Sequence, residues 1–197
     1  IALARTKYFK NIERIALITQ ADLRNVVIFP EKFKGRYARL DRPHSEISPW
    51  SIWISYSPDL VHWGDSRVIM KPLPYHWDEM KIGPGAPPFK TNKGWLHLYH
   101  GVFKTMAGAV YRLGVALHNL HDPAEIIGVS DQWILQPEAP WEVSGYVPNV
   151  VFTCGAVPEN DGSVKIYWGG ADTVMCAGRA HIDDLVQLCL TKTRAPL

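Results

Sequence analysis

The chain has few cysteines and no long apolar run. Its three cysteines, Cys154, Cys176 and Cys189, are odd in number and none shows C-x-x-C spacing, which argues against a disulfide framework or a zinc site. Reduced thiols are typical of cytoplasmic proteins, so we expect that location and no bound metal. Because no run of about 18 apolar residues is present, we expect no membrane-spanning helix.

Neither positive nor negative charge is in excess. The chain has 21 Lys and Arg and 19 Asp and Glu, which gives a net charge of +2. This balance gives no basic footprint for nucleic acid and would not hold the chain to an acidic membrane surface. We therefore expect no nucleic-acid and no membrane partner, while a homo-oligomer is left open. Neither a Gly-x-Ser-x-Gly nucleophile elbow nor a His-Glu-x-x-His helix is present.

Aromatic residues, glycine and proline are plentiful. The 197 residues include eight Trp, eight Tyr, 15 Gly and 15 Pro, and 47% of them are hydrophobic. The hydrophobic share is that of a globular domain with a real core. Aromatic residues favour strands and Gly and Pro favour tight turns, so the composition predicts many short strands.

One unit of about sixty residues recurs along the chain, marked by Phe29, Phe89 and Phe152 at the end of similar apolar runs. Each apolar run is followed by a turn ending in glycine, at Gly35, Gly94 and Gly162. Two strand-like segments come next in each unit, at residues 36–40 and 52–56, 95–99 and 111–117, and 164–168 and 174–180. The period and the short strands predict an all-β propeller with one blade per unit.

The first residues match only the end of this unit. Residues 14–20 read as a last strand, followed by the closing Asp22-Leu23 step. We therefore expect residues 1–197 to form a single β-propeller catalytic domain that carries about three complete blades and part of another. Propellers need four or more blades to close, so we expect one or two N-terminal blades upstream of this sequence. The best candidate helix is short, at residues 182–188.

Polar residues at strand ends are the candidates for chemistry. Arg42 and His44 follow the strand that ends at Leu40, and a guanidinium fork suits phosphate or carboxylate. A surface turn is the alternative for them. In a strand, His97 and His100 point to opposite faces, which makes them a poor metal pair. A structural role for His100 is the alternative there.

Three further residues are candidates for ligand contact. Lys81 stands before two glycines and three prolines, where stiff backbone could approach a ligand closely or simply connect two blades. Tyr111 opens a strand, and its hydroxyl could reach a ligand or cap the sheet. Asp172 follows a strand and could bind sugar hydroxyls or be an ordinary turn residue. The eight tryptophans could stack on sugars, but blade packing is the simpler assignment.

Several motifs together resemble glycoside hydrolase family 130. They are VIFPEKFKGRYARLDRP (27–43), SIWISYSPDLVHWG (51–64), KIGPGAPP (81–88), LYHGV (98–102) and VPNVVF (147–152). The resemblance runs in the same order from about Ala4 to Leu185. It implies a five-bladed β-propeller and, for most members, inverting phosphorolysis of β-mannosides by inorganic phosphate, which releases α-mannose 1-phosphate.

The resemblance also implies residue roles and no cofactor beyond phosphate as co-substrate. By position, it assigns phosphate binding to Arg42, His44, His100 and Tyr111, and substrate binding to Lys81 and Asp172. The family's general acid is an aspartate in a Glu-Asp-Pro-Arg-like motif, which is expected upstream of residue 1, so no catalytic acid is identified here. Asp122-Pro123 belongs to a different family motif.

Three functions remain open at this point. The first is phosphorolysis of β-mannosides such as β-1,4-mannosyl-glucose or β-1,4-manno-oligosaccharides. The second is hydrolysis, because hydrolytic members carry glutamates in place of phosphate-binding residues and Glu46 lies close to His44. The third is a propeller that binds carbohydrate without catalysis. The acceptor sugar is not fixed by the sequence.

Overall fold

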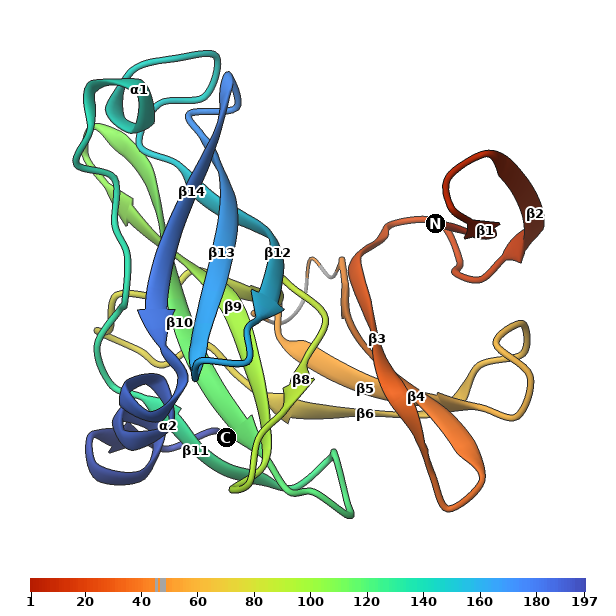
Figure 1. Ribbon diagram of the computed structural model, residues 1–197. Coiled ribbons are helices and arrows are strands. Elements are labelled where there is room, and N and C mark those ends of the chain that lie inside the picture. The colour runs from red at the N-terminus through yellow and green to blue at the C-terminus, as the bar shows by residue number, and fades with distance from the viewer. Residues whose placement is uncertain (45, 47–48) are drawn as a thin grey trace.

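The fold is all-β, as predicted, with strands arranged in consecutive antiparallel sheets (Figure 1). The computed structural model describes residues 1–44, 46 and 49–197. An N-terminal hairpin of β1 (Ala2–Lys7) and β2 (Asn11–Leu17) lies apart from the body. Three larger sheets follow along the chain.

The first larger sheet is a four-stranded meander that places Arg42 at the end of its second strand. It consists of β3 (Leu23–Phe33), β4 (Arg36–Pro43), β5 (Ile52–Ser57) and β6 (Gly64–Met70), hydrogen-bonded in that order. Gly35 turns β3 into β4 with φ +81°, a left-handed conformation that favours glycine.

The central sheet is built on two long strands, β9 (Trp95–Thr105) and β10 (Gly108–His118). Two short segments, β7 (Lys81–Pro84) and β8 (Phe89–Lys90), both pair with β9. They do not form one continuous strand, because the prolines between them lack the N–H that a continuous ladder needs. On the other side lie β11 (Ile126–Ser130) and β15 (Thr193–Arg194).

The third sheet contains β12 (Val151–Pro158), β13 (Ser163–Gly170) and β14 (Val174–His181). It therefore has three strands in the described part of the chain, one fewer than the first larger sheet. The physical reason is that α2 (Ile182–Thr191) follows β14 and leads the chain back to the central sheet, where β15 pairs with β11. The predicted helix at 182–188 is thus confirmed and slightly longer, whereas the short α1 (Pro140–Val143) was not predicted.

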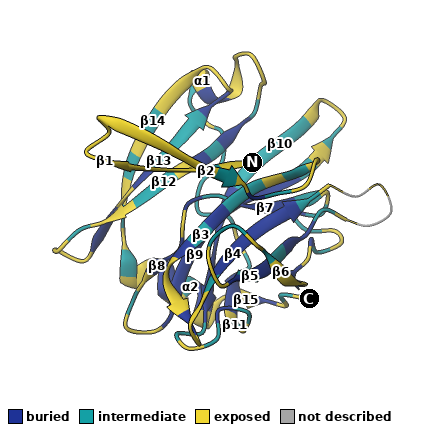
Figure 2. Ribbon diagram, turned by 90° about the vertical axis from the view of Figure 1, so that its right-hand side faces the viewer, coloured by how far each residue is buried: buried dark blue, intermediate teal, exposed yellow. Residues whose placement is uncertain are grey.

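Two hydrophobic cores cover the two faces of the central sheet. Side chains alternate along β9, so Trp95 and Tyr99 join the core against β3–β6, while Leu96 and Leu98 join the core against β12, β13 and α2. Figure 2 shows β4 and β9 largely buried and the hairpin β1–β2 and β14 largely exposed. Consecutive sheets thus pack face to face, as propeller blades do; the number of blades stays a prediction.

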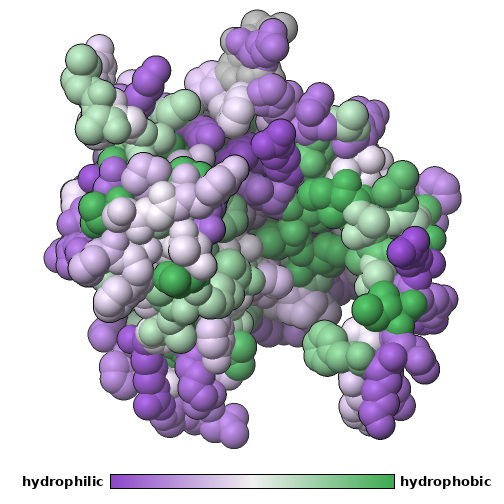
Figure 3. Space-filling view, turned by 90° about the horizontal axis from the view of Figure 1, so that it is seen from above, coloured by the Kyte–Doolittle hydropathy of each residue, from purple (hydrophilic) through white to green (hydrophobic). Residues whose placement is uncertain are grey.

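The molecule is hollowed on the side of the N-terminal hairpin. Seen from above, apolar side chains gather in this hollow and hydrophilic side chains surround it (Figure 3). Large apolar residues of the hairpin are exposed, among them Phe9, Ile12 and Leu17. In the described part of the chain, no helix has both the length and the apolar character needed to cross a bilayer.

Two buried histidines, His97 and His118, are expected to make the stability of the fold sensitive to acid. His118 donates from Nδ1 to the Pro123 carbonyl at 2.7 Å, and its Nε2 lies 3.3 Å from Nδ1 of His97. Burial lowers the pKa of His118 to about 4 and lowers the pKa of His97 well below its usual value, so both rings are neutral. Below pH ~6.5 both histidines become protonated in the unfolded chain but stay neutral in the folded chain. The free energy of unfolding therefore falls as the pH drops.

We expect each of these histidines to cost up to about 1.4 kcal/mol of unfolding free energy per pH unit below ~6.5. Thermal unfolding between pH 7 and pH 5 measures this slope. His118→Gln should flatten it, whereas the same change at the exposed His121 should not. Equal slopes in the wild type and His118→Gln would show that the buried pair is not responsible.

Candidate functional site

A cluster of cationic and aromatic side chains lies where β4, β7, β9, β10 and β12 approach one another. We call it the cationic cluster. Its members are buried or half-buried side chains linked by hydrogen bonds or ring contacts, namely Asn25, Arg42, Trp50, Lys81, His100, Tyr111 and Phe152. Four of the six predicted site residues therefore come together: Arg42, Lys81, His100 and Tyr111.

Arg42 and His100 form the buried centre of the cluster. Nη1 of Arg42 lies 3.0 Å from Nε2 of His100, and both residues are buried. A guanidinium can only donate, so Nε2 is the acceptor and the proton of a neutral imidazole must be on Nδ1. Burial lowers the pKa of His100 well below its usual value, and the charges of Arg42 and Lys81 lower it further. The imidazole is therefore uncharged at neutral pH.

Nδ1 of His100 is a buried donor without a hydrogen-bond partner among the described residues. An unsatisfied buried N–H is costly, and native proteins keep few of them. The His100 ring also packs against two other rings, and its centroid lies 4.5 Å from that of Phe152 and 6.0 Å from that of Tyr111. The imidazole is thus fixed in orientation, and its single N–H donor remains available.

Asn25 and Arg24 belong to this region although the sequence analysis did not select them. Nδ2 of Asn25 lies 3.3 Å from Nε2 of His100. Asn25 has φ 58°, at a bulge where β3 slips relative to β4, and asparagine tolerates this left-handed conformation better than most residues. The sequence signal for this position is the tripeptide Asn-Val-Val, which occurs at 25–27 and again at 149–151. Its asparagine has the same left-handed conformation both times, since Asn149 has φ 60°.

Arg24 adds a further positive charge beside Arg42, its cross-strand partner in β4. Burial lowers the pKa of Arg42, and Arg24 lowers it further against an opposing contribution from Tyr111. The half-buried Lys81 places its Nζ 5.2 Å from the centre of the Tyr111 ring. Across residues 1–44, 46 and 49–197, no carboxylate forms an ion pair with Arg24, Arg42 or Lys81.

His44 and Asp172 lie outside the centre of the cluster. His44 is exposed, and its ring meets the Trp50 ring edge-on with centroids 4.4 Å apart. Asp172 is exposed in the turn between β13 and β14 with φ 52°. That turn is bonded to the segment 146–149, which in turn accepts the Tyr111 N–H at the Asn149 carbonyl, 3.0 Å away. Asp172 thus belongs to a loop that borders the cluster.

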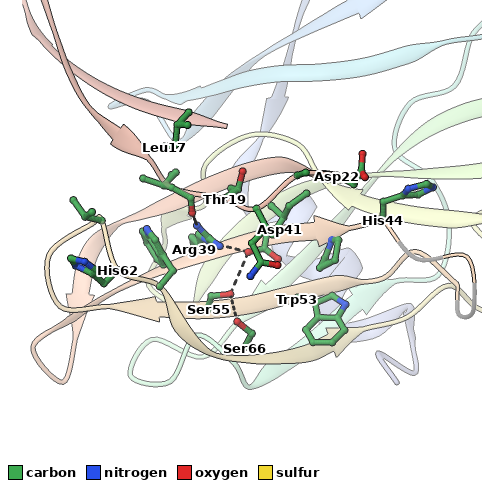
Figure 4. Close-up of a pocket in the computed structure, with 17 residues that line it drawn as sticks. Leu17, Thr19, Asp22, Arg39, Asp41, His44, Trp53, Ser55, His62 and Ser66 are labelled. Atoms are coloured by element: carbon green, nitrogen blue, oxygen red, sulfur yellow. Dashed lines mark hydrogen bonds and ion pairs between the residues drawn. The ribbon is translucent and has the colours of Figure 1, made fainter.

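A separate groove of about 670 Å³ lies beside the other face of β4 (Figure 4). Arg39 and Asp41 point into it because they alternate with Leu40 and Arg42 along the strand. They form a buried ion pair at 2.9 Å, and the Ser55 hydroxyl donates to Asp41 at 3.3 Å. Since these charges satisfy each other, the groove is a poorer anion site than the cationic cluster. Of the six predicted site residues only His44 lines it.

Comparison with known proteins decides the family. The family profile described as β-1,4-mannooligosaccharide phosphorylase matches residues 1–191. The chain belongs to glycoside hydrolase family 130. This confirms the resemblance derived from the sequence motifs.

Relatives in family 130 are phosphorylases of several mannosides. The 1,2-β-oligomannan phosphorylase of a Thermoanaerobacter species is 38% identical, over 94% of this chain and 60% of its own length. The β-1,4-mannooligosaccharide phosphorylase of Ruminococcus albus is 37% identical, over 83% of this chain and 49% of its own. The structure of the Listeria innocua β-1,2-mannobiose phosphorylase, in complex with β-1,2-mannobiose, superposes with a TM-score of 0.88 at 39% identity, covering 95% of this chain and 52% of that one. The chain thus spans about half to three fifths of these relatives.

Proposed function

We propose that this chain is part of a β-mannoside phosphorylase, in which the cationic cluster holds inorganic phosphate. One observation carries the proposal: Arg42 is buried together with a half-buried Lys81, and no described carboxylate pairs with either. A buried, unpaired cation is expensive unless an anion joins it. The guanidinium fork fits phosphate oxygens, and the lysine adds a compact positive charge.

In the proposed reaction, a phosphate oxygen attacks the anomeric carbon of a terminal β-mannosyl unit. The bond from that carbon to the glycosidic oxygen breaks, the oxygen takes a proton, and α-mannose 1-phosphate forms with inversion. The nucleophile brings its own charge, so the site needs cations where a hydrolase has a carboxylate base. No cofactor is required.

The cluster residues have distinct proposed tasks. Arg42, Lys81 and Arg24 neutralise and orient the phosphate, and His100 holds Arg42 through Nε2 while its Nδ1–H remains a free donor. Tyr111 borders the phosphate, and His44 and Asp172 border the sugar-binding region. The proton donor is proposed to be the aspartate that the family resemblance places outside this sequence, because no described member of the cluster is a carboxylic acid.

The mannosidic linkage that is cleaved needs its own test, because the relatives are named for β-1,2- and β-1,4-mannosides. The test is to incubate the complete protein with β-1,2-mannobiose or β-1,4-mannobiose, with and without inorganic phosphate, and to separate the products. Mannose 1-phosphate should form only when phosphate is present. Free mannose formed equally with and without phosphate would indicate a hydrolase. No product from either mannobiose or from β-1,4-mannosyl-glucose would indicate a binding protein.

Gly83 provides a sharper test of the cluster geometry. A Cβ at this position would lie 2.6 Å from Cε1 of His100, 2.7 Å from its Nε2 and 2.8 Å from Nδ2 of Asn25. Gly83→Ala must therefore displace one or both side chains, and a displacement near 1 Å can reduce the rate of an enzyme about 10²-fold.

We expect Gly83→Ala to lower kcat/KM for phosphate by about that factor. Gly64→Ala is the matched control, since a Cβ there meets no atom within 4 Å. If both variants kept wild-type kinetics, the position of His100 and Asn25 would not matter to the reaction.

A further inference from the structure

Among the residues that the structure describes, the Trp50 indole is the only aromatic ring that contacts three of the predicted site residues. Nζ of Lys81 lies 4.8 Å and Cζ of Arg42 lies 5.2 Å from its ring, and the His44 ring meets it edge-on. We propose that Trp50 is a positioning residue that holds Arg42 and Lys81 in place for phosphate. This proposal rests on the proposed function and adds a residue to it.

The electrostatic reason is that two cations must be held near each other before the anion arrives. The face of an indole ring carries negative potential, and cation–π attraction is strongest where water is excluded. Arg42 is buried and Lys81 is half-buried, so little water is available to screen their repulsion. One ring that attracts both side chains reduces the cost of keeping them together in the absence of phosphate.

The backbone fixes the indole relative to β7. The Trp50 carbonyl accepts the N–H of Ile82 at 2.9 Å, and Trp50 forms an isolated parallel bridge with Lys81. The hydroxyl of Ser51, a buried residue, donates to the Pro49 carbonyl at 2.9 Å. The first two contacts join the backbone of Trp50 to the strand that carries Lys81, and the Ser51 bond restrains the segment 49–51.

Lys81 is the side chain that gains most from this arrangement. A lysine has a flexible four-carbon stem and a rotatable ammonium group, so it does not hold a position without packing. Here Nζ lies over two rings, 4.8 Å from Trp50 and 5.2 Å from Tyr111. The rings restrict the ammonium group and leave its remaining donors to a phosphate.

The test compares Trp50→Leu, Trp50→Phe and Trp63→Leu in the complete protein by steady-state phosphorolysis. Trp63 is the matched control, because its half-buried indole also lies over a guanidinium, that of Arg39 at 4.5 Å, outside the cluster. We expect Trp50→Leu to raise KM for phosphate by about 10-fold or more with a smaller change in KM for the mannoside. Trp50→Phe keeps a smaller aromatic face and should lie between, and Trp63→Leu should leave KM for phosphate unchanged.

A purely structural role would give a different pattern. If Trp50→Leu and Trp50→Phe shifted both KM values equally, or if Trp50→Leu left KM for phosphate unchanged, the positioning role would be wrong while the phosphorylase assignment stood. If the wild type showed no dependence on phosphate, the proposed function itself would fail, and the positioning role with it. Urea unfolding of each variant confirms that the kinetic comparison is made on folded protein.

Discussion

Replacing Arg42 with methionine should lower phosphorolysis by about 10²–10³-fold, the usual effect of removing one preorganised donor to a reacting oxyanion. Methionine keeps most of the length and apolar stem of arginine but no charge. The loss should appear as a lower kcat/KM for phosphate, because Arg42 is the buried cation of the site and its Nη1 also holds His100 at 3.0 Å.

Arg36→Met is the control for this change. Arg36 lies on the same strand, β4, but its side chain is exposed and paired with Asp65, and exposed pairs contribute little. The control should keep wild-type kinetics. A kcat/KM for phosphate in Arg42→Met within a few-fold of the wild type would show that Arg42 is not the phosphate ligand.

Asp78→Ala should destabilise the fold by about 3–5 kcal/mol, because it leaves the buried Arg194 without its partner. Nη2 of Arg194 lies 2.6 Å from Oδ2 of Asp78, and both side chains are at most 2% exposed. The same carboxylate accepts from the Tyr99 hydroxyl at 3.3 Å and contacts Nδ1 of His76 at 2.8 Å. The group therefore links β15 and the loop before β7 to β9.

Urea unfolding of the wild type and Asp78→Ala measures this loss. Glu13→Ala provides the comparison, since it breaks an exposed ion pair with Arg5 that should contribute less than about 1 kcal/mol. Similar losses in both variants would mean that the buried ion pair does not stabilise the fold beyond an ordinary surface contact.

Local pattern explains what could be predicted of the fold. The glycine turns of the repeat lie where expected, with Gly35 between β3 and β4, Gly94 between β8 and β9, and Gly162 between β12 and β13. The signals were alternation, apolar runs and turn residues, all of which act over a few residues. The N-terminal strand was predicted less well: β2 (Asn11–Leu17) begins and ends earlier than residues 14–20, and among the described strands it pairs only with β1.

Contacts between distant segments explain what could not be predicted. Asp78 and Arg194 are 116 residues apart, and nothing in either local sequence indicates the pair. β15 joins the central sheet for the same kind of reason, through a helix that returns the chain.

The sequence also predicted only part of the candidate site. Arg42, Lys81, His100 and Tyr111 were selected as reactive types at strand ends and by resemblance, and the structure brings them together. The sequence pattern does not select Asn25, and it favours blade packing for Trp50 as for the other tryptophans. Their contribution depends on a bulge and on which side chains reach one ring, and both are properties of the packed structure.

Calorimetric titration of inorganic phosphate into the complete protein and into Arg42→Met tests directly whether the cationic cluster binds phosphate. We expect saturable binding to the wild type and binding at least about 10-fold weaker in the variant, since a charge-assisted bidentate contact is lost. No binding to the wild type, or equal affinity for both proteins, would contradict the assignment of the cationic cluster as the phosphate site.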